Sequence, residues 1–146
     1  MLYRSTDLSK IDFNNYISKF AYSLKDIYAS SAQDIKLEIN VKDIFLGVDK
    51  AVPCGIIINE LVTNSIKHAF KGSPKGIINI SMEITDGMCV LRIADNGVGI
   101  CKDFDLSQTD SLGMYLVTSL ASQLNAELDI ESNNGTVFTL KFREES

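Results

Sequence analysis

A polar stripe on one predicted helix, over residues 51–70, holds side chains that could bind a metal ion and a phosphate. Glu60, Asn64 and His68 recur at four-residue steps, and Lys67 lies beside them. Asparagine is a poor helix-interior residue, because its side-chain amide competes with the backbone for hydrogen bonds. An amide oxygen beside a carboxylate could ligate a hard divalent cation while the lysine meets a phosphate. The alternative is that the stripe is simply the solvated face of the helix.

A second candidate site directly follows a predicted strand, in the run Asp95-Asn96-Gly97-Val98-Gly99-Ile100. Two glycines spaced two apart let the backbone turn sharply and approach a ligand closely. The Asp95 carboxylate at the end of the strand can accept hydrogen bonds from an amino group. An ordinary Asp-Asn-Gly turn explains these residues equally well. The run is not the dinucleotide fingerprint, because no G-x-G-x-x-G opens a helix here.

A third candidate site is the start of a predicted helix over residues 112–124. Ser111 is a suitable N-cap, and free backbone amides at a helix N-terminus attract anions. A capped helix without a ligand explains the Ser111-Leu112-Gly113 run as well. The aperiodic stretch before it, residues 101–110, contains three aspartates. This stretch is compatible with a lid and equally with a solvated surface loop.

Hydrophobic periodicity predicts the elements that would position these three sites. The helical segments lie near residues 13–27, 51–70 and 112–124, and the strand segments near 35–41, 44–48, 78–84, 89–93, 128–130 and 138–142. Two hairpin turns, Thr85-Asp86-Gly87 and Asn133-Asn134-Gly135, join neighbouring strands, so the sheet cannot be all parallel. The economical arrangement is an α+β fold of two layers, a mixed sheet of about five strands with about three helices on one face.

Two residues indicate where the first two helices begin. Asp12 could cap the first helix through its carboxylate, because aspartate is among the preferred N-cap residues. Pro53 fits the first turn of the second helix, where a missing backbone N–H leaves no hydrogen bond unmade. We therefore expect that second helix to start near Ala51.

Composition limits the class of protein. The chain has 146 residues, of which 45% are hydrophobic and 23% charged, so it is suited to one folded domain without disulfide support. Lys and Arg number 14 against 19 Asp and Glu, and the resulting net charge of −5 argues against nucleic acid as the main partner. Three cysteines and one histidine form neither a disulfide framework nor a zinc pattern. We expect free thiols in a cytoplasmic protein and, because no apolar run is long enough to cross a bilayer, no membrane contact by this chain.

Taken in order, these segments resemble the ATP-binding catalytic domain of sensor histidine kinases, which belongs to the GHKL superfamily and has the Bergerat ATP-binding fold. Four motifs occur at compatible spacing, namely an N box at residues 59–70, a G1 box at 95–99, a reduced G2 box at 112–114 and a GGTxF-like segment at 134–138. The N box is similar to that of the subfamily with the second histidine-kinase dimerisation type. The resemblance implies an ATP-binding domain over residues 31–146, and a helical region over residues 1–30 that leads from the phosphoacceptor helices.

The resemblance also implies a role for each matching residue in binding ATP and Mg²⁺. Asn64 is implied as a metal ligand, and Glu60 as a second metal ligand or a catalytic general base. Lys67 is implied as a catalytic residue that contacts phosphate, and Asp95 as the residue that binds the adenine amino group. The other implied nucleotide-binding residues are His68, Gly97, Gly99, Ile100, Ser111, Leu112, Gly113, Met114 and Thr136.

The implied activity is transfer of the ATP γ-phosphoryl group to a histidine on a separate dimerisation domain of the same kinase, with a response regulator as an indirect partner in the phosphorelay. His68 is the only histidine and lies inside the N box. We therefore expect the chain to bind ATP without phosphorylating itself. The alternatives are a GHKL-type ATPase, an anti-sigma-like protein serine kinase and a binding module with a decayed nucleotide site. Two departures from the family pattern are evident. The lid is short, with one glycine in the G2 box and no phenylalanine-rich F box near Phe104. The larger departure is that we expect no phosphoacceptor helix pair within this sequence.

Overall fold

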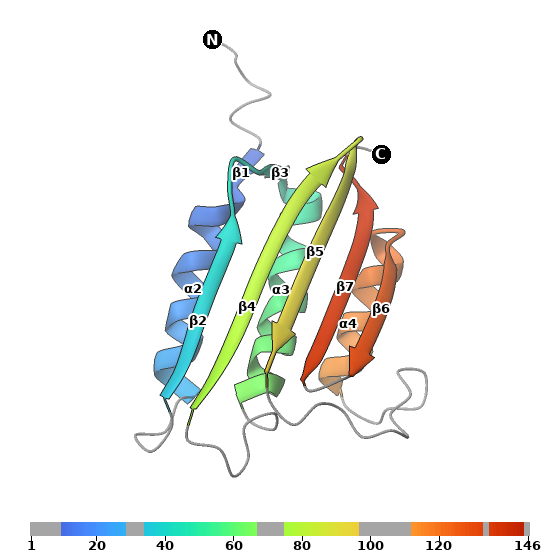
Figure 1. Cartoon of the computed structure of the whole chain (residues 1–146). Coiled ribbons are helices and arrows are strands. Elements are labelled where there is room, and N and C mark those ends of the chain that lie inside the picture. The colour runs from blue at the N-terminus through green and yellow to red at the C-terminus, as the bar shows by residue number, and fades with distance from the viewer. Residues whose placement is uncertain (1–9, 29–33, 67–74, 97–111, 133–134, 145–146) are drawn as a thin grey trace.

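The computed structural model describes residues 10–28, 34–66, 75–96, 112–132 and 135–144. These residues form three helices and seven strands arranged in two layers (Figure 1). In chain order the elements are β1 (Lys10–Asp12), α2 (Phe13–Tyr28), β2 (Asp34–Val41), β3 (Phe45–Gly47), α3 (Val48–Asn64), β4 (Lys75–Thr85), β5 (Met88–Asp95), α4 (Leu112–Gln123), β6 (Glu127–Ser132) and β7 (Thr136–Arg143). The predicted α+β class is confirmed.

The larger sheet has five strands in the order β2-β4-β5-β7-β6. β2 and β4 are parallel, whereas the other neighbouring pairs are antiparallel. The β4–β5 hairpin turns at Asp86 and Gly87, whose φ angles of 53° and 78° are left-handed. Two successive left-handed residues are what a tight hairpin turn requires. The mixed sheet that the turn residues predicted is therefore confirmed.

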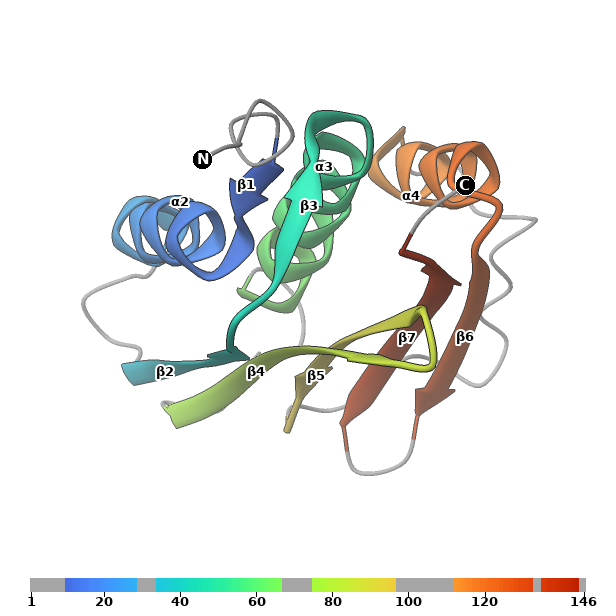
Figure 2. The same ribbon diagram turned by 90° about the horizontal axis from the view of Figure 1, so that it is seen from above.

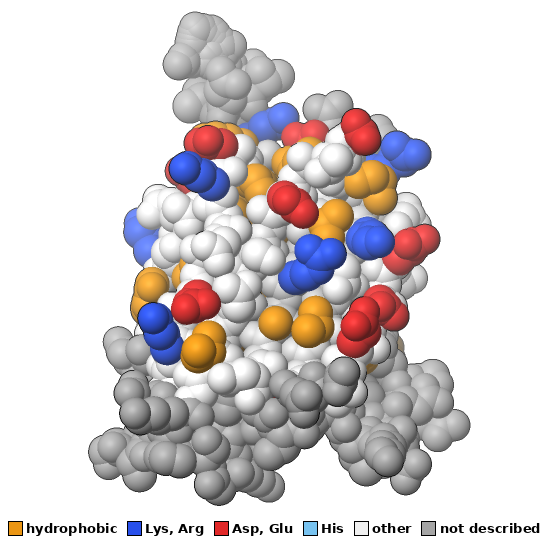
Figure 3. Space-filling view, viewed as in Figure 1, with side chains coloured by type: hydrophobic (Ala, Val, Ile, Leu, Met, Phe, Trp, Pro, Cys, Tyr) orange, Lys and Arg blue, Asp and Glu red, His pale blue; other side chains and the backbone are white. Residues whose placement is uncertain are grey.

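All three helices lie on one face of this sheet (Figure 2), and α3 lies between α2 and α4. The core between the two layers includes the fully buried side chains of Phe13, Ile17, Ile57 and Leu91. The opposite face of the sheet carries charges of both signs mixed together (Figure 3). In the part of the chain that the structure describes, none of the helices has the length and apolarity needed to span a bilayer.

The first strand, β1, was not predicted from the sequence. This strand pairs antiparallel with β3, with Lys10 opposite Gly47, in a separate two-stranded sheet. A strand of three residues is too short to show an alternating pattern, so periodicity cannot reveal it.

The two predicted helix starts had different outcomes. The backbone N–H of Asn15 donates to Oδ1 of Asp12 at 3.3 Å, so Asp12 caps α2 as expected. The expected position of Pro53 in the first turn of α3 was wrong, because α3 already begins at Val48 and Pro53 lies inside the helix. The extended backbone of Gly47, at the end of β3, sets this earlier start. The absent N–H of Pro53 then removes the helical hydrogen bond to the carbonyl of Asp49.

Two of the three cysteines are buried in the interior. Cys54 on α3 and Cys89 on β5 are free thiols with no exposed surface. Desolvation by burial raises the pKa of Cys54 from 9.0 to about 12 and the pKa of Cys89 from 9.0 to about 11. Both thiols are therefore protonated and unreactive in the folded chain at neutral pH.

We expect a Cys101→Ser variant to react slowly with a disulfide reagent at pH 8 when folded, and rapidly once unfolded. Raising the pH above 9 should also lower its free energy of unfolding, because the unfolded thiols lose their protons first. The loss should reach up to about 1.4 kcal/mol per pH unit for each thiol until the folded-state pKa is passed. Urea titrations at pH 8 and pH 10 measure this loss. A triple variant that also lacks Cys54 and Cys89 should not show this pH-dependent loss of unfolding free energy. Equal labelling of the folded and the unfolded chain by the disulfide reagent would contradict the burial of the two thiols.

Candidate functional site

The candidate site lies where Asp95, the last residue of β5, meets the end of α3, close to the start of α4 (Figure 1). The hydroxyl of Ser65 donates to Oδ2 of Asp95 at 2.9 Å, which joins α3 to β5. The amide nitrogen of Asn64 donates to Sδ of Met114 at 3.7 Å, which joins α3 to α4. The structure thus brings together three of the motifs that the sequence analysis singled out.

The backbone around Asp95 is held by both neighbouring strands. Asp95 lies opposite Ile78 of β4 and opposite Thr136 of β7. The next residue, Asn96, donates its N–H to the carbonyl of Ile77 at 3.2 Å, and its Oδ1 accepts the N–H of Ile77 at 2.7 Å. A carboxylate on such a backbone is positioned before any ligand arrives, which lowers the cost of binding.

The backbone of Gly135 passes close to the backbone of Asp95. Its φ angle is +126°, and a Cβ at this position would lie 2.1 Å from the carbonyl oxygen of Asp95. Only glycine satisfies both conditions. Thr136, the next residue, has a side chain that is only 4% exposed. The predicted turn glycine therefore also allows β7 to start directly beside Asp95.

The described part of the polar stripe, at the end of α3, is only partly exposed to solvent. Glu60, Thr63 and Asn64 are half-buried, and α4 packs beside α3. On the other side of the helix, a buried arc is formed by Ile58, Leu61, Val62, Ser65 and Ile66. Asn64 and Glu60 are one helical turn apart, at the end of α3 that lies next to Asp95.

The donor atoms present suit a hard divalent cation. The amide nitrogen of Asn64 is directed at Met114. The amide oxygen is bonded to the same carbon and is therefore directed away from Met114. Mg²⁺ takes oxygen ligands and typically uses one or two protein groups together with phosphates and waters. The amide oxygen of Asn64 and the carboxylate of Glu60 fit this requirement.

Several predicted site residues lie outside the described residues, namely Lys67, His68, Gly97, Gly99, Ile100 and Ser111. Leu112 is the first residue of α4, and Gly113 in the same turn is half-buried. The Met114 side chain is buried, 3% exposed, and its sulfur contacts Asn64.

Ser65 is the site residue that the sequence analysis did not recognise. Ser65 belongs to the buried arc of the helix, and no role was predicted for its hydroxyl. A buried hydroxyl almost always has a hydrogen-bond partner, so a serine within an otherwise apolar arc was a usable signal. The sequence could not indicate that the partner is Asp95, which lies 30 residues further along the chain.

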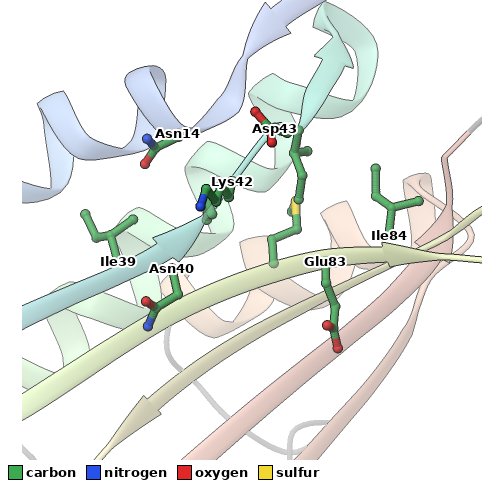
Figure 4. A pocket seen from close by; sticks show the side chains of 10 residues that line it. Asn14, Ile39, Asn40, Lys42, Asp43, Glu83 and Ile84 are labelled. Carbon is green, nitrogen blue, oxygen red and sulfur yellow. The ribbon is translucent and has the colours of Figure 1, made fainter.

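Two hollows occur at the other end of the sheet, away from Asp95. One, of about 630 Å³, is lined by Asn14, Ile39, Asn40, Val41, Lys42, Asp43, Ile44, Met82, Glu83 and Ile84 (Figure 4). The second, of about 640 Å³, includes Met88 and Arg143 at the opposite ends of β5 and β7 from the Asp95–Thr136 pair. Neither hollow includes Asn64 or Asp95, so both are separate from the candidate site.

Known proteins resemble this chain over most of its length. The family model described as histidine kinase-, DNA gyrase B- and HSP90-like ATPase matches residues 49–146. A blue-light-activated histidine kinase 2 from Erythrobacter litoralis (strain HTCC2594) is 26% identical over 132 residues, which cover 89% of this chain and 38% of that protein. An anti-sigma F factor from Geobacillus sp. (strain WCH70) is 42% identical over 104 residues, which cover 64% of this chain and 70% of that protein.

A solved structure gives the same result at the level of the fold. The histidine kinase domain of a blue-light activated histidine kinase from Erythrobacter litoralis superposes with a TM-score of 0.84 at 25% identity. The superposition covers 92% of this chain and 62% of that domain. The two-layer arrangement and its connectivity are therefore shared over nearly all of the chain.

Proposed function

Because this chain belongs to the family of histidine kinase-, DNA gyrase B- and HSP90-like ATPases, we propose that it is the ATP-binding catalytic domain of a two-component sensor histidine kinase. Its reaction is transfer of the ATP γ-phosphoryl group to a histidine on a separate dimerisation domain, with a response regulator as the indirect recipient. The match to a histidine kinase over 89% of the chain supports this proposal. The chain spans 38% of that kinase, so the remainder of the reaction belongs to other domains.

The observation that carries the proposal is the placement of the Asp95 carboxylate beside the end of α3. The carboxylate is held by Ser65, and its backbone by β4 and β7. In this proposal the carboxylate accepts a hydrogen bond from the amino group of adenine, and Thr136 supports that contact. A carboxylate that is fixed before binding distinguishes a base with an amino group from one with a carbonyl group at the same position.

The phosphates of ATP would lie toward α3 and α4. Asn64 and Glu60 would hold Mg²⁺, and the chemistry that this cation would supply is positive charge beside the phosphates. Glu60 and Lys67 are the proposed catalytic residues. The remaining proposed nucleotide contacts come from His68, Gly97, Gly99, Ile100, Ser111, Leu112, Gly113 and Met114. Phosphoryl transfer requires mainly positioning and electrostatic stabilisation, which these residue types supply.

The proposed reaction needs a second domain. Residues 1–30 form the region that leads from the phosphoacceptor helices, and residues 31–146 form the ATP-binding domain, with a cytoplasmic location. Within the first region, α2 contributes Phe13 and Ile17 to the common core. We expect the chain alone to bind ATP without autophosphorylation, and to phosphorylate a histidine domain supplied separately.

A thermal-shift titration with ATP, with and without Mg²⁺, tests the proposal. A ligand at one hundred times its Kd stabilises the native state by about 2.7 kcal/mol. For a chain of this size that corresponds to a rise in Tm of roughly 5–10 °C. We expect this rise with ATP and Mg²⁺, a smaller rise without Mg²⁺, and none with GTP.

An Asn64→Ala variant provides the control for the metal. It should still bind ATP weakly, but Mg²⁺ should no longer increase the shift in Tm. An unchanged Mg²⁺ dependence would exclude Asn64 as a metal ligand. Absence of any shift at millimolar ATP in the wild-type chain would contradict the proposed function.

Protein serine kinase activity is the second candidate function, because an anti-sigma F factor is 42% identical over 104 residues. The two candidates differ in the bond that they form on the acceptor. A phosphohistidine is labile in acid and stable in base, whereas a phosphoserine is stable in acid. Incubation with labelled ATP and each type of acceptor protein, followed by acid treatment, therefore separates the two.

A further inference from the structure

The Ser65–Asp95 hydrogen bond has a consequence for which base the site accepts. We propose that Ser65 is a positioning residue that sets the preference for adenine, by holding one oxygen of the Asp95 carboxylate so that the carboxylate faces the base in one orientation. This proposal rests on the proposed function, because it concerns the same nucleotide site. It adds Ser65, which was not among the site residues predicted from the sequence, as a determinant of nucleotide specificity.

The geometry of Ser65 suits this role. Its hydroxyl lies 2.9 Å from Oδ2 of Asp95, and the residue is only 7% exposed. Its backbone N–H already bonds to the carbonyls of Leu61 and Val62, so the backbone is satisfied within the helix. The side-chain hydroxyl is thus left to donate to Asp95 at the end of β5.

Packing alone does not require a serine at this position. The other members of the buried arc, such as Leu61, Val62 and Ile66, are apolar. An alanine would fill nearly the same volume without bringing a polar group into the core. Burial of a hydroxyl is costly unless it is hydrogen-bonded, and here the bond is to a carboxylate. The serine is therefore explained by its effect on Asp95.

The chemistry of the carboxylate explains the preference. An ionised carboxylate only accepts hydrogen bonds and has about four acceptor positions, of which Ser65 takes one. With Oδ2 held from the side of α3, rotation of the carboxylate is restricted. An amino group on a bound base can then donate to it, whereas a carbonyl oxygen at the same position on the base would be repelled. Loss of the hydroxyl should therefore weaken the amino-group contact more than the rest of the nucleotide contacts.

The test compares ATP with purine riboside triphosphate, which has hydrogen in place of the 6-amino group. Isothermal titration calorimetry with Mg²⁺ gives the Kd of each nucleotide for the wild-type chain and for Ser65→Ala. We expect Ser65→Ala to weaken ATP binding about tenfold, in line with the loss of a hydrogen bond to a charged group. Binding of the analogue should change less than twofold, so the preference for ATP over the analogue should fall about tenfold.

Two further variants complete the experiment. Ser65→Thr keeps the hydroxyl and should keep the preference for ATP, whereas Ser119→Ala, at an exposed position on α4, should change neither Kd. Equal weakening of both nucleotides by Ser65→Ala would show a merely structural role and overturn the proposal, as would no weakening of either. If the wild-type chain binds neither nucleotide, the proposed function itself fails and this proposal fails with it.

Discussion

Replacing Asp95 by asparagine should weaken ATP binding by one to two orders of magnitude while leaving the fold intact. The change removes the negative charge but keeps the size of the side chain. Ser65 can still donate to the remaining amide oxygen, which leaves the new NH₂ group facing the amino group of adenine. Two donors would then face each other. A hydrogen bond to a charged group contributes roughly 1.5–3 kcal/mol, which corresponds to the expected range of affinity.

Calorimetric titration of ATP, together with a circular-dichroism melt, measures this effect. Asp129→Asn is the matched control, because Asp129 is exposed on β6 and the substitution removes the same charge. It should leave the Kd unchanged. A native melt combined with wild-type ATP affinity in the Asp95→Asn variant would exclude Asp95 as the residue that binds the base.

Gly135→Ala should lower the free energy of unfolding by at least about 2 kcal/mol. At φ +126° an L-residue is strained, and such strain costs of order 1–3 kcal/mol. The new Cβ would in addition lie 2.1 Å from the carbonyl oxygen of Asp95. That oxygen belongs to the backbone of β5, which is paired on both sides and cannot move without breaking hydrogen bonds. Urea titration monitored by circular dichroism measures the loss.

Gly87→Ala separates the two causes. Gly87 has a φ angle of +78°, and a Cβ there would meet nothing within 4 Å. Only the backbone strain applies, so we expect a loss of about 1–2 kcal/mol. Equal losses for the two variants would mean that the approach of Gly135 to Asp95 adds nothing. Because Gly135 supports Asp95, the Gly135→Ala variant should also bind ATP more weakly at temperatures at which it remains folded.

The regular elements could largely be predicted from the sequence, because local patterns specify them. Alternation along residues 78–84 and 89–93, with Asp86 and Gly87 between them, is sufficient to define the β4–β5 hairpin. The carboxylate of Asp12 caps α2, as its residue type predicts. These features depend on interactions between residues that are close in the chain, so a single segment carries the information.

The errors occurred where a distant segment decides the local structure. β1 exists because β3 supplies its hydrogen bonds, and α3 begins at Val48 because β3 ends at Gly47. Neither the short strand nor the first turn of the helix has a hydrophobic repeat of its own. The position of Pro53 was wrong for the same reason.

Residue types and local patterns indicate which side chains are available for chemistry and on which elements they lie. Asn64, Glu60 and Asp95 were predicted as site residues from their types and spacing together with the family resemblance. The hydrogen bond from Ser65 to Asp95 and the passage of Gly135 beside Asp95 follow from tertiary packing, because these contacts join residues 30 or more positions apart. Such contacts depend on how α3 packs over β5 and on the register between β5 and β7, and no local pattern encodes either.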